Sequence, residues 1–136
     1  MKETEELLSN SGITPTPVRK LVLKCISESQ VPLSLSDLEM KLVSVDKSSI
    51  SRSLSIFKEH HLLHSFSDGS GSVKYELSNV HRHDEANGLH VHFRCERCGM
   101  TKCLTSVKIP EVILPKGYVA HESNYVITGI CEGCNR

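Results

Sequence analysis

Two pairs of cysteines constrain this chain more than any other feature of its sequence. Cys95 and Cys98 form one Cys-x-x-Cys pair, Cys131 and Cys134 form another, and 32 residues lie between the pairs. Each pair can bend the backbone into a knuckle that aims two sulfur atoms at one ion, and two knuckles make a closed tetrahedral zinc site. A thioredoxin-like redox pair would instead need one knuckle at a helix start and no second knuckle. The spacing therefore predicts a structural zinc ion, with strands between the knuckles.

Composition favours metal ligands over disulfides for these cysteines. The 136 residues suffice for one domain or two small ones, and a lobe of about 60 to 80 residues often needs a metal ion or a partner chain for stability. The start of the chain has no signal-peptide pattern and no apolar run approaches about 20 residues, so we expect a cytoplasmic protein with reduced thiols. The formal net charge is zero, so any surface that binds nucleic acid must be local.

The first half of the chain has helical periodicity followed by a hairpin. A short helix is predicted over 3–10, and three further helices have candidate N-caps at Thr16, Ser36 and Asp46. Two short alternating runs then flank the turn signal at 68–71. Helices followed by a two-stranded wing form the winged variant of the helix-turn-helix, although a generic small helical bundle with a hairpin would show the same pattern.

The second half reads as strands, and strand alternation separates two kinds of ligand. Runs at 90–95 and 125–131 alternate, whereas 109–114 is predicted as a short helix or a strand. His90 and His92 then share one face of their strand, and Cys95 lies on the other. The two histidines are therefore candidates for a second metal site, and Cys103, which is left over from the knuckles, is a natural third ligand.

The order of these elements resembles the ferric uptake regulator family of bacterial metal-sensing repressors. The resemblance is most specific in the Thr-Pro-Val-Arg run at 16–19, the His-x-His-x-x-Cys-x-x-Cys-Gly run at 90–99 and the Gly-Ile-Cys-x-x-Cys run at 129–134. It implies an α+β chain with an N-terminal winged helix-turn-helix DNA-binding domain over 1–80 and a linker over 81–88. A small C-terminal α/β dimerisation domain over 89–136 then carries the four-cysteine zinc site. The implied partners are a second copy and double-stranded DNA with a palindromic operator.

The resemblance also suggests the composition of the regulatory metal site. Its ligands would be drawn from both halves of the chain: His64, Glu76, His90, His92 and Cys103, with His81 or His83 as further candidates. Pro32 replaces a histidine that iron and peroxide sensors use, and Cys103 stands where the family usually has a carboxylate. A thiolate shifts preference toward zinc. The sequence is thus most similar to the zinc uptake regulator branch, with an iron-responsive repressor as the alternative.

DNA contacts are expected around the candidate recognition helix at 47–60. The residues that we expect to face DNA are Arg19, Lys20, Lys47, Ser49, Ser51 and Arg52. Ser51 stands where the family usually has a tyrosine, so a zinc-stabilised interaction module without DNA binding remains an alternative. An enzyme is not expected, because the sequence has no His-Glu-x-x-His motif.

Overall fold

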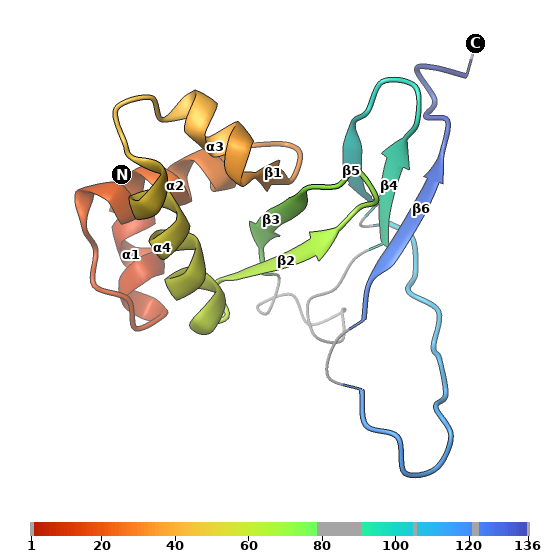
Figure 1. Cartoon of the computed structure of the whole chain (residues 1–136). Coiled ribbons are helices and arrows are strands. Elements are labelled where there is room, and N and C mark those ends of the chain that lie inside the picture. The colour runs from red at the N-terminus through yellow and green to blue at the C-terminus, as the bar shows by residue number, and fades with distance from the viewer. Residues whose placement is uncertain (1, 79–90, 105, 121–122, 136) are drawn as a thin grey trace.

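A helical part and a strand part, joined by a β-hairpin, make up the chain (Figure 1). The computed structural model describes residues 2–78, 91–104, 106–120 and 123–135. The helices are α1 (Lys2–Asn10), α2 (Pro17–Glu28), α3 (Leu35–Lys41) and α4 (Lys47–Glu59). The strands are β1 (Leu33–Ser34), β2 (Leu63–Ser67), β3 (Val73–Leu77), β4 (Val91–Cys95), β5 (Thr101–Leu104) and β6 (Tyr125–Gly129).

The helices begin at side chains that accept backbone hydrogen bonds. Thr16 accepts from the Arg19 N–H ahead of α2, and Asp46 accepts from the Ser49 N–H ahead of α4, as the sequence predicts. The prediction for α3 was wrong, since Ser34 rather than Ser36 is the N-cap. Ser34 and Asp37 exchange hydrogen bonds of 2.9 and 3.1 Å in a capping box, which needs an acid three residues after the cap.

One apolar core holds the helices together with the hairpin. Leu8, Leu23, Leu38 and Phe57 are fully buried in it, one from each helix, and the hairpin adds further apolar side chains. Each fully buried aliphatic or aromatic side chain stabilises the fold by roughly 1.5 to 3 kcal/mol. The helices and the hairpin are thus one packed unit, the winged helix-turn-helix arrangement that the sequence predicted.

The strands form two separate three-stranded sheets. The first has the order β1-β3-β2 and is antiparallel, so the hairpin forms most of it. The second has the order β5-β4-β6, in which β4 pairs antiparallel with β5 and parallel with β6. Because β5 runs antiparallel to β4, it returns the chain to the end of the sheet at which β6 begins, and β5 and the connection after it separate the two cysteine pairs.

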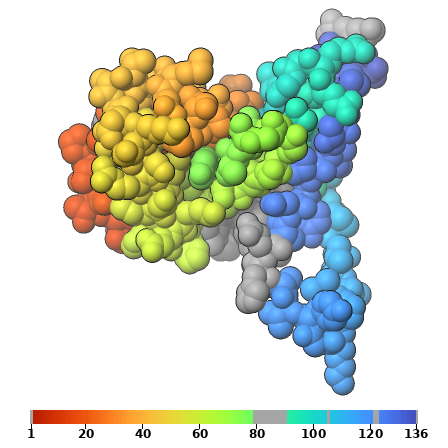
Figure 2. Space-filling model, viewed as in Figure 1, coloured from red at the N-terminus to blue at the C-terminus, as the bar shows by residue number. Residues whose placement is uncertain are grey.

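The crossover between β5 and β6 is irregular over its described residues. The segment 109–114, for which a short helix or a strand was predicted, forms neither. The described part of the β5–β6 connection protrudes from the body of the molecule (Figure 2) and exposes apolar side chains, among them Ile113, Tyr118 and Val119. No helix in the described parts of the chain combines the length and the apolar character that a membrane crossing needs.

Candidate metal centres

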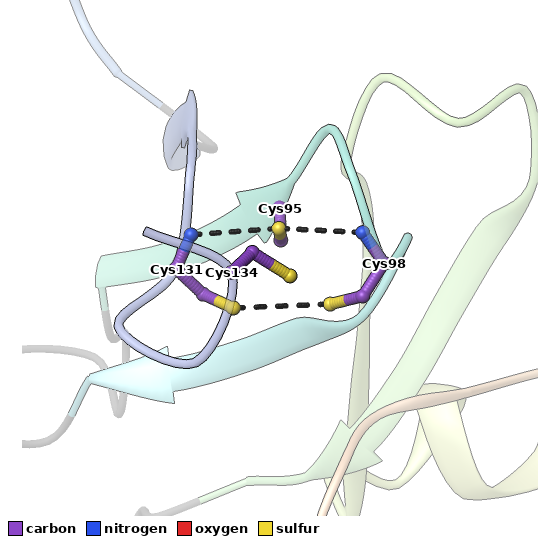
Figure 3. Close-up of side chains that lie close together, drawn as sticks. All are labelled: Cys95, Cys98, Cys131 and Cys134. Atoms are coloured by element: carbon purple, nitrogen blue, oxygen red, sulfur yellow. Dashed lines mark hydrogen bonds between the residues drawn. The ribbon is translucent and has the colours of Figure 1, made fainter. Parts of the chain in front are cut away.

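The four knuckle cysteines converge at one end of the second sheet (Figure 3). Cys95 ends β4 and Cys131 follows β6 closely; because these strands are parallel, both knuckles form at the same edge. All four sulfur atoms lie within 4.8 Å of one another, and the Cys98 and Cys131 sulfurs are 3.9 Å apart. Zinc–sulfur bonds of about 2.3 Å in a tetrahedron place sulfurs about 3.8 Å apart. The donor set and its spacing therefore fit a zinc ion.

Backbone amides and neighbouring thiols set the protonation of this cluster. The N–H groups of Cys98 and Cys131 each donate to Cys95 Sγ at 3.4 Å, and these bonds lower the pKa of Cys95 to about 6. The nearby Cys131 and Cys95 sulfurs raise the pKa of Cys134 to about 12. Four thiolates would repel one another at this distance, so the cluster needs a cation to hold all of them deprotonated.

A second cluster forms where the hairpin meets the second sheet. Glu76 of β3 lies opposite His64 of β2, and His92 reaches it from β4. The Nε2 atoms of His64 and His92 lie 2.6 and 2.7 Å from the same oxygen, Glu76 Oε1. One ligand atom from each residue falls within a group no wider than 4.8 Å. Two imidazoles and a carboxylate from two sheets are thus placed to hold a single ion.

The two histidines stabilise the ionised form of the Glu76 carboxylate. Burial opposes its ionisation, but hydrogen bonds from His64 and His92 outweigh burial and lower the pKa of Glu76 to about 2. Its side chain is only 14% exposed. A buried carboxylate with two imidazole partners is a ready ligand for a divalent metal.

The residues also predicted as ligands of this centre are Cys103, His81, His83 and His90. Cys103 lies directly opposite His92 in the register of β4 and β5, so the two share a face of the sheet. It is not among the three residues whose ligand atoms cluster, and its part in the site stays a prediction. His81, His83, His90 and the linker at 81–88 lie outside the described residues.

The predicted DNA-facing residues lie on and near α2 and α4. Ser51 and Arg52 are exposed on α4, and Lys47 at its start is exposed with its Nζ 4.0 Å from Glu39. Ser49 has a local role, since its hydroxyl donates to the N-cap Asp46 at 2.7 Å.

Two of these residues contact the part of the chain that precedes α2. Arg19 donates to the Thr14 carbonyl at 2.8 Å, and Lys20 pairs with Glu5 at 2.8 Å. Their contacts with DNA remain predictions, as do those of the residues on α4.

Sequence reasoning missed the contacts that dock the wing on the second sheet. The Phe66 ring stacks on the His92 ring with centroids 3.7 Å apart, and the Thr101 hydroxyl donates to the Asp68 carboxylate. These residues are distant in sequence. The only sequence signal was the alternation that puts His64, Phe66 and Asp68 on one face of the hairpin.

Comparison with known proteins identifies the family. The model of the ferric uptake regulator family matches residues 10–129. The ferric uptake regulation protein of Campylobacter jejuni is 24% identical over 148 residues, which cover 99% of this chain and 88% of that protein. The peroxide operon regulator of Bacillus subtilis is 22% identical over 147 residues, covering 100% of this chain and 94% of that protein.

Solved structures show the same fold. A zinc uptake regulator complexed with zinc and DNA superposes with a TM-score of 0.66 at 19% identity, covering 98% of this chain and 91% of that one. The ferric uptake regulator of Vibrio cholerae gives a TM-score of 0.64 at 17% identity, covering 93% of this chain and 98% of that one. Since the family model spans most of the sequence, the chain belongs to the ferric uptake regulator family and is a metal-responsive transcriptional regulator rather than an enzyme.

Proposed function

We propose that the chain is a zinc-responsive repressor of metal-uptake genes that acts in the cytoplasm as a DNA-binding dimer. The observation that carries the proposal is the meeting of His64, Glu76 and His92, which come from both the wing and the second sheet. A site built from two units responds to metal by fixing how those units sit relative to each other.

The donor atoms need only a small rearrangement to take a metal ion. Tetrahedral ligands at about 2.0 to 2.1 Å from zinc lie about 3.3 to 3.4 Å apart. The Nε2 to Oε1 distances of 2.6 and 2.7 Å are therefore hydrogen bonds that must open by less than about 1 Å. To bind the ion through Nε2, each imidazole must carry its proton on Nδ1, which leaves the Nε2 lone pair free for the metal.

The preference for zinc rests on a fourth, softer ligand. The three clustered donors suit either zinc or iron(II), whereas thiolate sulfur favours zinc. Cys103 lies beside His92 on the same face, and we propose that its thiolate completes the site together with His90. His83 is a further candidate for the same role.

An iron-responsive repressor is the second candidate. The central ligand of the cluster is a carboxylate held by two imidazoles, a donor set that non-haem iron(II) also uses. The alternative holds if the thiolate of Cys103 does not ligate.

Bound metal is proposed to set the spacing of two winged domains in a dimer. The exposed apolar segment that includes Ile113, Tyr118 and Val119 offers a surface for a second copy. With α4 as recognition helix, two copies related by a two-fold axis would reach successive major grooves of a palindromic site. Free protein samples other spacings, and binding DNA from that state carries a population cost that metal removes.

Metal-dependent DNA binding tests the proposal. Duplexes selected from a random-sequence pool on zinc-loaded protein should be two-fold symmetric. Gel-shift titration should show at least tenfold weaker binding after mild chelation, and zinc should restore affinity better than iron(II). Glu76→Gln should remove this dependence, while Glu111→Gln, an exposed carboxylate of the crossover, should keep it. Equal affinity with and without metal would refute metal sensing.

A further inference from the structure

Asp68 carries a buried carboxylate at the tip of the wing, where the neighbouring residues are exposed to water. Asp68 is 1% exposed, while its neighbours Ser67 and 69–73 are all exposed. Residues of a hairpin tip can be buried only by a surface outside the hairpin. Here that surface is the second sheet, because the Thr101 hydroxyl of β5 donates to Asp68 Oδ2.

Asp68 is satisfied by donors from both sides of this contact. Its Oδ1 accepts from the Ser70 N–H at 3.0 Å, and Lys74 Nζ lies 3.9 Å from Oδ2, both within the hairpin. Thr101 is the donor from the second sheet. Arg94 lies opposite Thr101 in the register, and a Cβ on Gly69 would sit 3.9 Å from its Nη1. Burying a carboxylate is tolerated only when such partners are present.

The same face of the hairpin carries the proposed regulatory site at its other end. His64, Phe66 and Asp68 occupy alternate positions, and on the second sheet His92 and Arg94 do the same. The contacts run in order from the His64–Glu76–His92 cluster, through the Phe66–His92 stack, to Asp68 and Thr101. Only the first of these three contacts involves metal ligands alone.

We infer that Asp68 and Thr101 form a metal-independent latch that docks the wing on the second sheet. The latch keeps the two halves of the His64–Glu76–His92 cluster close together before metal arrives. Metal then adds a second point of attachment and does not have to bring the units together from a distance. Asp68 and Thr101 are positioning residues, and their effect on metal affinity rests on the proposed function.

Removing the Thr101 hydroxyl should weaken docking more than a lost surface contact would. In Thr101→Val the docked wing would bury Asp68 Oδ2 without its donor from β5. Leaving a buried charged acceptor short of a donor costs more than the bond itself contributes, and the undocked wing escapes that cost by exposing Asp68 to water. Docking should therefore weaken by roughly tenfold.

Hydrogen exchange of the full chain, with only exchangeable metal removed by mild chelation, tests the latch directly. The Ser70 amide reports on it, since it donates to Asp68. Thr101→Val should exchange about tenfold faster over 68–73 and over β5, with α2 and α4 unchanged. Thr101→Ser keeps the hydroxyl and should resemble the wild type. Thr128→Val, on an exposed position of β6, is the matched control.

Zinc titration of the same variants separates the latch from the proposed function. If the ion binds only when the wing is docked, added zinc should slow exchange over 68–73 in the wild type and in Thr101→Val, because binding shifts the equilibrium toward the docked state. Faster exchange in Thr101→Val that added zinc does not slow would keep the latch and count against the proposed metal site. Unchanged exchange over 68–73, or acceleration spread equally over α2 and α4, would overturn the latch.

Discussion

At the scale of single residues, one carboxylate oxygen organises the second cluster. Glu76 Oε1 is the common partner of His64 and His92, which reach it from different sheets. The Ser78 hydroxyl lies 3.5 Å from Nδ1 of His64, near the other side of that ring. A charge held by two imidazoles in a site of low exposure contributes to folding and to metal binding through the same contacts.

Acid should reveal the contribution of Glu76 to stability. Its pKa of about 2 in the fold lies below the ordinary 4.5, so its contribution is present above pH 4.5 and is lost as pH falls toward 2. The shift corresponds to roughly 3 kcal/mol. Urea unfolding of metal-stripped protein should therefore lose more stability between pH 4.5 and 2 in the wild type than in Glu76→Gln. If the stability of the wild type and of Glu76→Gln fell equally with pH, the histidines would not stabilise the ionised Glu76 carboxylate.

Cys103 is the residue on which the proposed preference for zinc depends. Cys103→Ser should keep one tightly held zinc per chain and the wild-type melting transition, because it leaves the four knuckle cysteines intact. It should lose the exchangeable zinc or shift preference toward iron(II), as oxygen replaces a soft ligand. Metal analysis and operator binding measure both effects, with Cys25→Ser as a control outside both clusters. Unfolding of the variant would make Cys103 structural.

At the scale of elements, residue alternation and cysteine spacing predicted the strands and the two clusters, whereas the contacts between segments distant in sequence were not predicted. The cysteine spacing indicated strands between the knuckles, and alternation put His92 and Cys95 on opposite faces of β4; these two residues lie in separate clusters. The parallel pairing of β4 with β6 could not be predicted, because period-two patterns carry no direction. The contact of Asp68 with Thr101 was also missed, since the polarity of a turn aspartate looks the same whether it is solvated or buried.

The parallel pairing of β4 and β6 gives the knuckle cysteines a testable structural role. Cys131→Ser removes one of four sulfur donors and frees the chain end from β4. Because structural zinc contributes directly to folding, the second sheet should lose its cooperative melt and the dimer should dissociate, while the helical core keeps its helix content. Calorimetry and dimer mass by light scattering would show this. A variant with wild-type melting and mass would mean that these cysteines serve another purpose.

At the scale of the whole molecule, the hairpin is the coupling element. It packs its apolar side on the helical core through residues such as Leu63 and Tyr75. Its other face carries His64, Phe66 and Asp68 to the second sheet. Under the proposed function, a change in ligation at this joint is expected to move α4 together with the hairpin, since the two belong to one packed unit.

DNA binding should depend on this reorientation and on few charges. With a formal net charge of zero, attraction to phosphates is expected to be local to the surface around α4, the predicted recognition helix. Arg52 is exposed there, held by a 3.4 Å hydrogen bond to Ser49 Oγ, and the serines beside it are too short to reach far into a groove. Arg52 is therefore the side chain best placed to read a base edge.

Arg52→Ala should weaken binding of the metal-loaded dimer to its selected operator by roughly 1 to 3 kcal/mol and relax sequence preference at one base pair of each half-site. Lys47→Ala, which removes a cation at the helix start, should weaken binding to all sequences alike and make the salt dependence shallower by about one phosphate contact per half-site. Gel-shift titrations at several salt concentrations, on operator and on single-base variants, distinguish the two effects. If Arg52→Ala changes only the salt slope, Arg52 contacts phosphate, and specificity must come from the shape of the DNA rather than from this side chain.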